Sequence, residues 1–166
     1  MQKPDMRNPV LFLAFGLGSG LAPKAPGTFG SLAALPFFVL LALLPLPVFL
    51  LVVAIAGIAG IWICGRAATL MGVHDHSGIV WDEFVGQWLT LLPLLPLADG
   101  WSLSAALWIV LGFALFRLFD VLKPWPISWF DDNVHGGLGI MLDDVLAAIP
   151  AGLLLWLCRY EWVRWA

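Results

Sequence analysis

The sequence is poor in charged residues. Only 11% of its 166 residues are charged and 61% are hydrophobic, whereas ordinary soluble domains have about 25% charged and roughly 45 to 50% apolar residues. Much of the chain therefore does not have the surface of a water-soluble protein. The net charge is −3, and no basic stripe is present that would neutralise a nucleic-acid backbone. We expect no nucleic-acid partner, and we expect any phosphate to be bound singly.

Cysteine is also scarce. Cys64 and Cys158 each lie in an apolar run, without a second cysteine at metal or redox spacing, so we interpret both as small buried hydrophobic residues. Tyrosine occurs once but tryptophan ten times, and many tryptophans lie near the ends of apolar runs, where membrane headgroups would meet them. Length allows one domain over residues 1–166, with residues 1–10 as a polar tail.

Proline and glycine interrupt the apolar runs. No charged residue occurs between Lys24 and Arg66, but Pro45 and Pro47 break this stretch into two helices. We predict helices over residues 31–44, 47–70, 84–97, 103–119 and 143–160, with a polar loop over residues 123–139. Several have only about 14 residues, roughly 21 Å, while a spanning helix needs about 20 residues. The prediction is an all-α, compact, membrane-embedded bundle of about five short helices, multi-pass or partly inserted, with polar glycine-rich loops on one face.

The predicted hairpins return the polar motifs to one side of the membrane. The segments around Thr28, Asp82, Asp120 and Asp143 would all lie there. Basic residues on the same side are Lys3, Arg7, Lys24, Arg66, Arg117 and Lys123. An excess of Lys and Arg indicates the cytoplasmic side, so we expect a site that faces the cytoplasm.

The acidic residues are few and clustered. The groups are Asp82-Glu83, Asp120, Asp131-Asp132 and Asp143-Asp144. An acidic pair at a helix start can simply complement the helix dipole. Two such pairs and Asp120 can also converge, and carboxylate oxygens are the ligands that magnesium takes. We favour a magnesium site held by Asp82, Glu83, Asp143 and Asp144, with Asp120 as a further ligand or general base.

Two kinds of feature could bind a phosphate. Arg117, Asp120 and Lys123 follow one another at i, i+3 and i+6; they form either a surface ladder of ion pairs or a phosphate clamp beside the carboxylates. Glycines in residues 25–31 and 135–139 either make tight turns or let backbone N–H groups approach an anion. The second interpretation makes Thr28, Gly136 and Gly137 phosphate-binding candidates.

Other sequence features argue against rival sites. His74-Asp75-His76 is too compact for its three side chains to bind one ion easily, so we interpret it as a polar loop feature, and His135 as a loop residue that forms hydrogen bonds. The Asp-x-Asp-x-Thr nucleophile motif of other phosphatases is missing. A covalent enzyme intermediate is not indicated, and the expected nucleophile is a water polarised by magnesium.

Four ordered blocks resemble one known family. They are residues 18–20 with 25–31, residues 74–76 through 79–84, residues 116–120 with 123–127, and residues 135–144. Together they resemble the phosphatidylglycerophosphatase A family over nearly the whole chain from Gly16. The resemblance implies an all-helical, magnesium-dependent lipid phosphatase of the bacterial inner membrane. It also implies a phospholipid substrate, phosphatidylglycerophosphate, which is hydrolysed to phosphatidylglycerol and phosphate.

Two rival functions stay open at this stage. One is a magnesium-dependent phosphatidyl transferase, which also uses clustered aspartates, although its long motif with two aspartates is absent. The other is a small cation transporter without enzymatic activity. A transporter would want acids in the middle of apolar helices, whereas the predicted helices carry them at their ends.

Overall fold

In the computed structural model, which describes residues 4–73, 76–100 and 102–165, the regular structure is helical. In chain order the elements are α1 (Pro9–Ala14), the 3-10 helix η1 (Gly16–Leu21), α2 (Pro26–Leu41), α3 (Leu46–Met71), α4 (Trp81–Thr90), the 3-10 helix η2 (Leu92–Gly100), α5 (Leu103–Leu122), α6 (Ile127–Asn133) and α7 (Gly136–Trp165). No strand occurs in the described ranges. The predicted all-α fold is confirmed.

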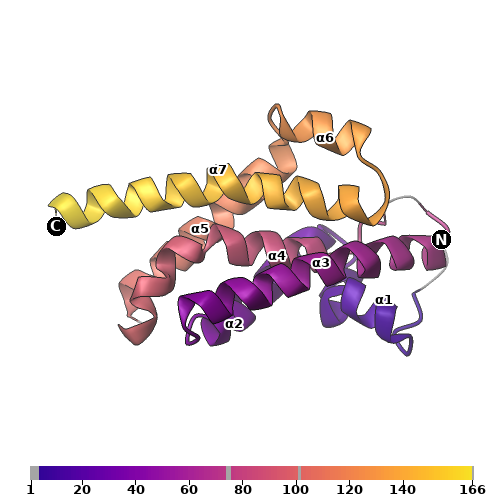
Figure 1. Cartoon of the computed structure of the whole chain (residues 1–166), viewed down its shortest axis with the longest axis horizontal. Coiled ribbons are helices and arrows are strands. Elements are labelled where there is room, and N and C mark those ends of the chain that lie inside the picture. The colour runs from indigo at the N-terminus through magenta and orange to yellow at the C-terminus, as the bar shows by residue number, and fades with distance from the viewer. Residues whose placement is uncertain (1–3, 74–75, 101, 166) are drawn as a thin grey trace.

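Helix α4 is the centre of the bundle, because it contacts α2, α3, α5 and α7. Most of its ten residues are buried. The longest helix, α7, runs along the length of the molecule, from the end where α1 lies to the opposite end, which carries the C-terminus (Figure 1). A side chain near the start of α7 and one near its end are therefore on opposite sides of the molecule.

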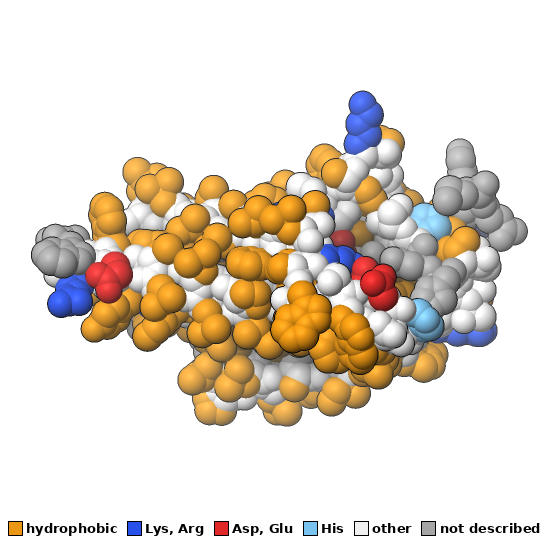
Figure 2. Space-filling model, turned by 90° about the horizontal axis from the view of Figure 1, so that it is seen from above, with side chains coloured by type: hydrophobic (Ala, Val, Ile, Leu, Met, Phe, Trp, Pro, Cys, Tyr) orange, Lys and Arg blue, Asp and Glu red, His pale blue; other side chains and the backbone are white. Residues whose placement is uncertain are grey.

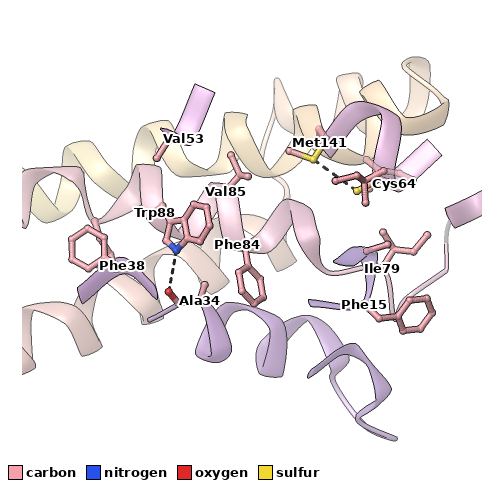
Figure 3. Close-up of a cluster of buried hydrophobic side chains, with 14 of the residues drawn as sticks. Phe15, Ala34, Phe38, Val53, Cys64, Ile79, Phe84, Val85, Trp88 and Met141 are labelled. Carbon is pink, nitrogen blue, oxygen red and sulfur yellow. Dashed lines mark hydrogen bonds between the residues drawn. The ribbon is translucent and has the colours of Figure 1, made fainter. Parts of the chain in front are cut away.

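Aromatic side chains join α4 to its neighbours in the core. The buried Trp88 donates its indole N–H to the carbonyl oxygen of Ala34 in α2, at 3.0 Å (Figure 3). Phe84 packs edge-on against Trp88, with ring centroids 5.9 Å apart, and stacks on Trp81. A buried tryptophan usually finds a partner for its N–H, and here that bond fixes α4 against α2.

The outer surface of the bundle is apolar. The described helices α3, α5 and α7 are long and apolar enough to cross a membrane, and only 22% of the apolar window of α3 and 17% of that of α5 are buried inside the protein. Figure 2 shows hydrophobic side chains over the middle of one face, with charged side chains toward its two ends. An apolar surface this extensive marks a contact with membrane or protein, in agreement with the predicted membrane-embedded bundle.

Several predicted helix bounds are confirmed and others are wrong. The proline break is right, since α2 ends at Leu41 and α3 begins at Leu46. The predicted helix over residues 84–97 is wrong, because α4 ends at Thr90 and Pro93 and Pro96 lie in a separate 3-10 segment. Proline cannot continue the hydrogen bonds of an α-helix. The predicted loop over residues 123–139 contains α6 and the first turn of α7.

Smaller predictions have mixed outcomes. Helix α1 begins at Pro9, inside the segment 1–10 that we interpreted as a tail, and Asn8 caps it by accepting the N–H of Val10. Cys64 is buried as predicted, but the prediction that Cys158 is buried is wrong, since it is exposed. His74 and Asp75 lie outside the described residues. His76 accepts a hydrogen bond from the N–H of Gly78.

Gly137 lets α7 approach α3 backbone to backbone. A Cβ atom on Gly137 would collide with the carbonyl oxygen of Ile61 and lie 2.7 Å from the backbone nitrogen of Gly65. We expect Gly137→Ala to destabilise the protein by about 3 kcal/mol, the upper range for overpacking, and to lower the unfolding temperature in detergent by roughly 6 °C or more.

The matched control for this prediction is Gly152→Ala in the same helix. Its added Cβ would lie 3.4 Å from the nearest atom, an ordinary contact, and alanine favours helix over glycine by about 1 kcal/mol. We expect its unfolding temperature to equal or exceed that of the wild type. If both variants melt alike, Gly137 does not set the packing of α7 on α3.

Candidate metal and phosphate site

Three carboxylates from two helices meet beside one another. Asp82 and Glu83 lie in the first turn of α4, and Asp144 lies eight residues into α7. Each offers one oxygen, and these three oxygens lie within 4.8 Å of one another. The exposed fractions are 9% for Asp82 and Glu83 and 2% for Asp144. The structure thus brings together three of the four predicted metal ligands, which we call the carboxylate cluster.

Each member of the carboxylate cluster has one buried oxygen without a hydrogen-bond partner among the described residues. These are Asp82 Oδ1, Glu83 Oε2 and Asp144 Oδ2. Leaving a buried acceptor unpaired costs about 1 to 3 kcal/mol, and more when it is charged. A hard divalent cation takes carboxylate oxygens as ligands. The donor set therefore fits the magnesium ion that the sequence predicted.

Electrostatics within the cluster favour a cation as well. Burial raises the pKa of the Asp82 and Glu83 carboxyls well above their usual range, and the charge of the neighbouring carboxylates raises each pKa further. Both residues lie in α4, outside the three apolar spans. A bound cation would relieve the repulsion between these carboxylates and favour their ionised form.

A glycine determines how closely the two acidic helices approach. A Cβ on Gly86 of α4 would lie 2.7 Å from the ring of Phe116 and 3.1 Å from the backbone oxygen of Asp144. With hydrogen there instead, α4 packs directly on α7. Because Asp82 is one turn before Gly86, this contact brings the first turn of α4, with its two carboxylates, next to Asp144.

Arg117 of α5 is the cation next to the cluster. Its Nη1 is 3.8 Å from Glu83 Oε1 and also pairs with Asp120, and it donates to Ser31 Oγ in α2 at 3.3 Å. Its Nε is buried without a partner among the described residues. The ion pair between Arg117 and Asp120, which the surface-ladder interpretation predicted, is therefore present. Arg117 also contacts Glu83 of the carboxylate cluster.

Lys123 pairs with two other acids. Its Nζ is 2.6 Å from Asp143 Oδ2 and 2.8 Å from Asp131 Oδ1. Burial alone would lower the pKa of Lys123, but these two bonds outweigh it and raise the pKa. Asp143 therefore lies beside the cluster with an ion-pair partner of its own. The structure does not bring it into the group of three carboxylates.

The first turn of α2 closes another side of the site. The predicted loop over residues 25–31 is wrong, because α2 begins at Pro26 and Thr28 lies in its first turn, half-buried. A Cβ on Gly27 would collide with Glu83 Oε1 and lie 3.1 Å from Arg117 Nη1. Thr28 is thus next to a residue that touches both charged groups.

The second glycine segment is positioned differently from the prediction. Gly136 begins α7 with a φ of +73°, and nothing lies within 4 Å of a Cβ placed there, whereas Gly137 packs on α3. Because α7 begins at Gly136, Asp143 and Asp144 lie two turns inside a helix. The prediction that Asp143 and Asp144 begin a helix is wrong. The expectation that the acidic residues lie at the ends of the helices is therefore also wrong for these two.

Two polar residues of α4 were not identified from the sequence as candidate site residues. Gln87 and Thr90 are 0% exposed, and the side-chain nitrogen and oxygens of both have no hydrogen-bond partner among the described residues. They follow Glu83 at i+4 and i+7, so one face of α4 continues the polar site inward. That spacing is visible in the sequence and could have identified them.

A cysteine and an arginine near the C-terminus have the spacing of a phosphatase signature motif. Arg164 follows Cys158 at six positions, the spacing of the cysteine-dependent phosphatases. Both residues lie within the continuous helix α7. Helical backbone N–H groups are bonded to carbonyls four residues earlier, so no loop of free N–H groups surrounds the thiol. A thiol nucleophile is not indicated.

Comparison with known proteins identifies the family. The sequence profile of the family "Phosphatidylglycerophosphatase A" matches residues 12–159. The chain belongs to this family. It is 49% identical over 157 residues to phosphatidylglycerophosphatase A of Escherichia coli strain K12, covering 95% of this chain and 87% of that protein. No solved structure matches it.

Two further relatives extend the comparison. Phosphatidylglycerophosphatase A of Haemophilus influenzae is 45% identical over 161 residues, 96% of this chain and 94% of that protein. A protein of Bacteroides thetaiotaomicron, named as a candidate phosphatidylinositol-3-phosphatase, is 38% identical over 165 residues, 96% of this chain and 98% of that protein. The resemblance stated from the sequence blocks is confirmed, and membership in the phosphatidylglycerophosphatase A family makes this chain a phosphatase.

Proposed function

We propose that this protein hydrolyses phosphatidylglycerophosphate to phosphatidylglycerol and inorganic phosphate, with magnesium held by Asp82, Glu83 and Asp144. The observation that carries the proposal is the carboxylate cluster, with three buried oxygens that lack a hydrogen-bond partner among the described residues and an arginine beside them. Clustered carboxylates next to a phosphate-binding cation are the arrangement that phosphoryl transfer needs. The names of the relatives in Escherichia coli and Haemophilus influenzae support the substrate.

The residues around the cluster have distinct proposed roles. Arg117 and Lys123 bind the phosphate by exchanging part of their carboxylate contacts for phosphate oxygens. Thr28, Gly136 and Gly137 are proposed as further phosphate contacts, and Asp143 as a fourth magnesium ligand when Lys123 is on the phosphate. Asp120, which lies next to Asp144, accepts the proton of the attacking water. The bond between phosphorus and the glycerol oxygen breaks, and that oxygen takes up a proton to leave as the hydroxyl group of phosphatidylglycerol. The ion, when bound, supplies a Lewis acid that polarises a phosphate oxygen and lowers the pKa of water.

We place the site at the cytoplasmic face of the bacterial inner membrane. Gly65 packs beside Gly137, which puts the neighbouring Arg66 at the same end of the molecule as the start of α7. Arg117 and Lys123 are at the site itself. This concentration of basic residues at one end supports the cytoplasmic side. The substrate's acyl chains would lie along the apolar helices while its phosphate stays at the membrane surface.

Phosphate release in detergent micelles tests the proposal. The substrates compared are phosphatidylglycerophosphate, phosphatidic acid and phosphatidylinositol 3-phosphate, each with magnesium and with excess chelator. We expect release from phosphatidylglycerophosphate to be the fastest and the chelator to abolish it. Faster release from phosphatidylinositol 3-phosphate would refute phosphatidylglycerophosphate as the preferred substrate. It would favour the activity for which the Bacteroides thetaiotaomicron relative is named. Full release in the presence of chelator would refute the magnesium site.

A further inference from the structure

A hollow of about 750 Å³ lies at the opposite end of the bundle from the carboxylate cluster. The turn between α2 and α3, at Leu44 and Leu46, forms one wall, and Pro93 of η2 with Trp156 and Arg159 of α7 forms another. Two hollows that α7 lines, one with η2 and one with α3, are almost wholly apolar, whereas this hollow offers substantial polar surface. It is therefore suited to an amphipathic ligand.

Arg159 is the one charged residue among the described residues that line this hollow. It is half-buried and donates from Nη1 to the carbonyl oxygen of Pro93 at 2.6 Å. A guanidinium has five N–H donors in a planar fork, so this bond leaves most of them for other partners. A cation in apolar surroundings favours an anionic partner, and none of the described lining residues is a carboxylate.

The position of Arg159 along α7 places it near the far membrane surface. It follows Asp144 by 15 residues of the same helix, which corresponds to about 22 Å at 1.5 Å per residue. The hydrocarbon core of a bilayer is about 30 Å thick. With the carboxylate cluster at one surface, as proposed above, the Arg159 backbone lies within about 8 Å of the other surface, and a long arginine side chain can extend toward the headgroups there. Trp156 and Tyr160 stack beside Arg159 with centroids 5.7 Å apart, and aromatic residues of this kind are enriched at headgroup level.

An apolar groove continues from the hollow along α7. Leu92, Pro93 and Trp156 line both the hollow and the groove, which has a volume of about 410 Å³ and extends back to Val145. Trp156 follows Val145 by eleven positions of α7, so the groove is about 16 Å long. The pair of sites thus offers a cation at headgroup level and an apolar channel that leads from it into the membrane.

We propose that the hollow at Arg159 and its groove bind an anionic phospholipid of the leaflet opposite the carboxylate cluster. The lipid phosphate pairs with the Arg159 guanidinium, and one acyl chain occupies the groove between η2 and α7. A phospholipid without net charge fits less well, because the positive charge of its ammonium group offsets the attraction of its phosphate to Arg159, and the described lining residues include no carboxylate to receive that ammonium. The proposal rests on the proposed position of the carboxylate cluster at one membrane surface, but not on the reaction that the cluster performs.

Native mass spectrometry of the purified protein tests the proposal. The protein in detergent is titrated with phosphatidylserine or with phosphatidylcholine, and lipid-bound species are counted. Neither lipid has a phosphate monoester, so neither is a substrate of the proposed reaction. We expect phosphatidylserine to bind at least about tenfold more tightly than phosphatidylcholine, the effect of one charge-assisted pair. Equal binding of the two lipids would overturn the proposal.

Two variants assign the preference to this hollow. Arg159→Gln removes the charge but keeps an N–H donor for Pro93, and Leu46→Glu introduces a carboxylate into the hollow while Arg159 stays in place. Both are expected to lose the tenfold preference, and Arg164→Gln, which removes a charge from the same end outside the hollow, is expected to keep it. Melting temperature and phosphate release confirm that each variant is folded. Retention of the preference in folded Arg159→Gln or folded Leu46→Glu would also overturn the proposal.

Discussion

Replacing Asp144 or Asp82 by asparagine is expected to reduce phosphate release by more than about 100-fold without destabilising the protein. Loss of even an outer partner at a metal site costs roughly 10- to 100-fold in affinity or activity, and these residues are proposed as direct ligands. Each substitution also removes one of three repelling charges from a buried cluster. The metal-free variant should therefore unfold at the same temperature as the wild type or above it.

A loss of phosphate release without a loss of stability distinguishes a metal ligand from a residue with a structural role. A carboxylate that merely holds the fold together would lower activity and stability in parallel. The control is Asp132→Asn, which changes an exposed acid and is expected to leave both quantities at wild-type values. Wild-type release by Asp144→Asn, measured with limiting magnesium, would remove Asp144 from the proposed ligands.

Arg117→Lys is expected to lower phosphate release by about 10- to 100-fold, equivalent to one hydrogen bond to a charged group at about 1.5 to 3 kcal/mol. Arg117 contacts Glu83, Asp120 and Ser31 at once. Lysine keeps the positive charge but has one nitrogen and cannot bind a phosphate with a planar fork. The loss should appear mainly as a higher KM, because the proposed contact is with the substrate's phosphate.

A lysine at position 117 keeps a positive charge beside the carboxylate cluster. Removing the charge altogether would leave buried carboxylates unpaired and cost about 3 to 5 kcal/mol, which would confuse folding with substrate binding. Arg66→Lys, at an exposed position of α3, is the matched control and is expected to behave as the wild type. An unchanged KM in folded Arg117→Lys would mean that this arginine only neutralises Asp120 and Glu83.

The sequence predicted the elements of the fold well where proline and apolar length decide them. The break at Pro45 and Pro47 separates α2 from α3 as expected. Prediction failed at residues 136–142, where three glycines suggested a loop. Local propensity disfavours helix there, but Gly137 lets α7 pack directly on the α3 backbone. That contact between distant segments stabilises the helix and is not visible in the local sequence.

The sequence was sufficient to predict which residues form the candidate site, but not which of them contact one another. Asp82, Glu83 and Asp144 were identified because carboxylates are rare in so apolar a chain, and the structure brings them together. Neighbouring residues of a helix point about 100° apart, so only one of Asp143 and Asp144 can face α4. The sequence does not show which of the two does so. In the structure, one faces the cluster while the other pairs with Lys123. The role of Gly86 depends on the contact between α4 and α7, which spacing alone does not reveal.

The most direct test of the central claim is the position of manganese in crystals of the active protein, located by its anomalous scattering. Manganese takes the same oxygen ligands as magnesium. We expect a peak at about 2.1 Å from oxygens of Asp82, Glu83 and Asp144, which disappears in Asp144→Asn. A peak only at the exposed Asp131 and Asp132, or no peak in crystals grown from protein that requires the metal for phosphate release, would contradict it.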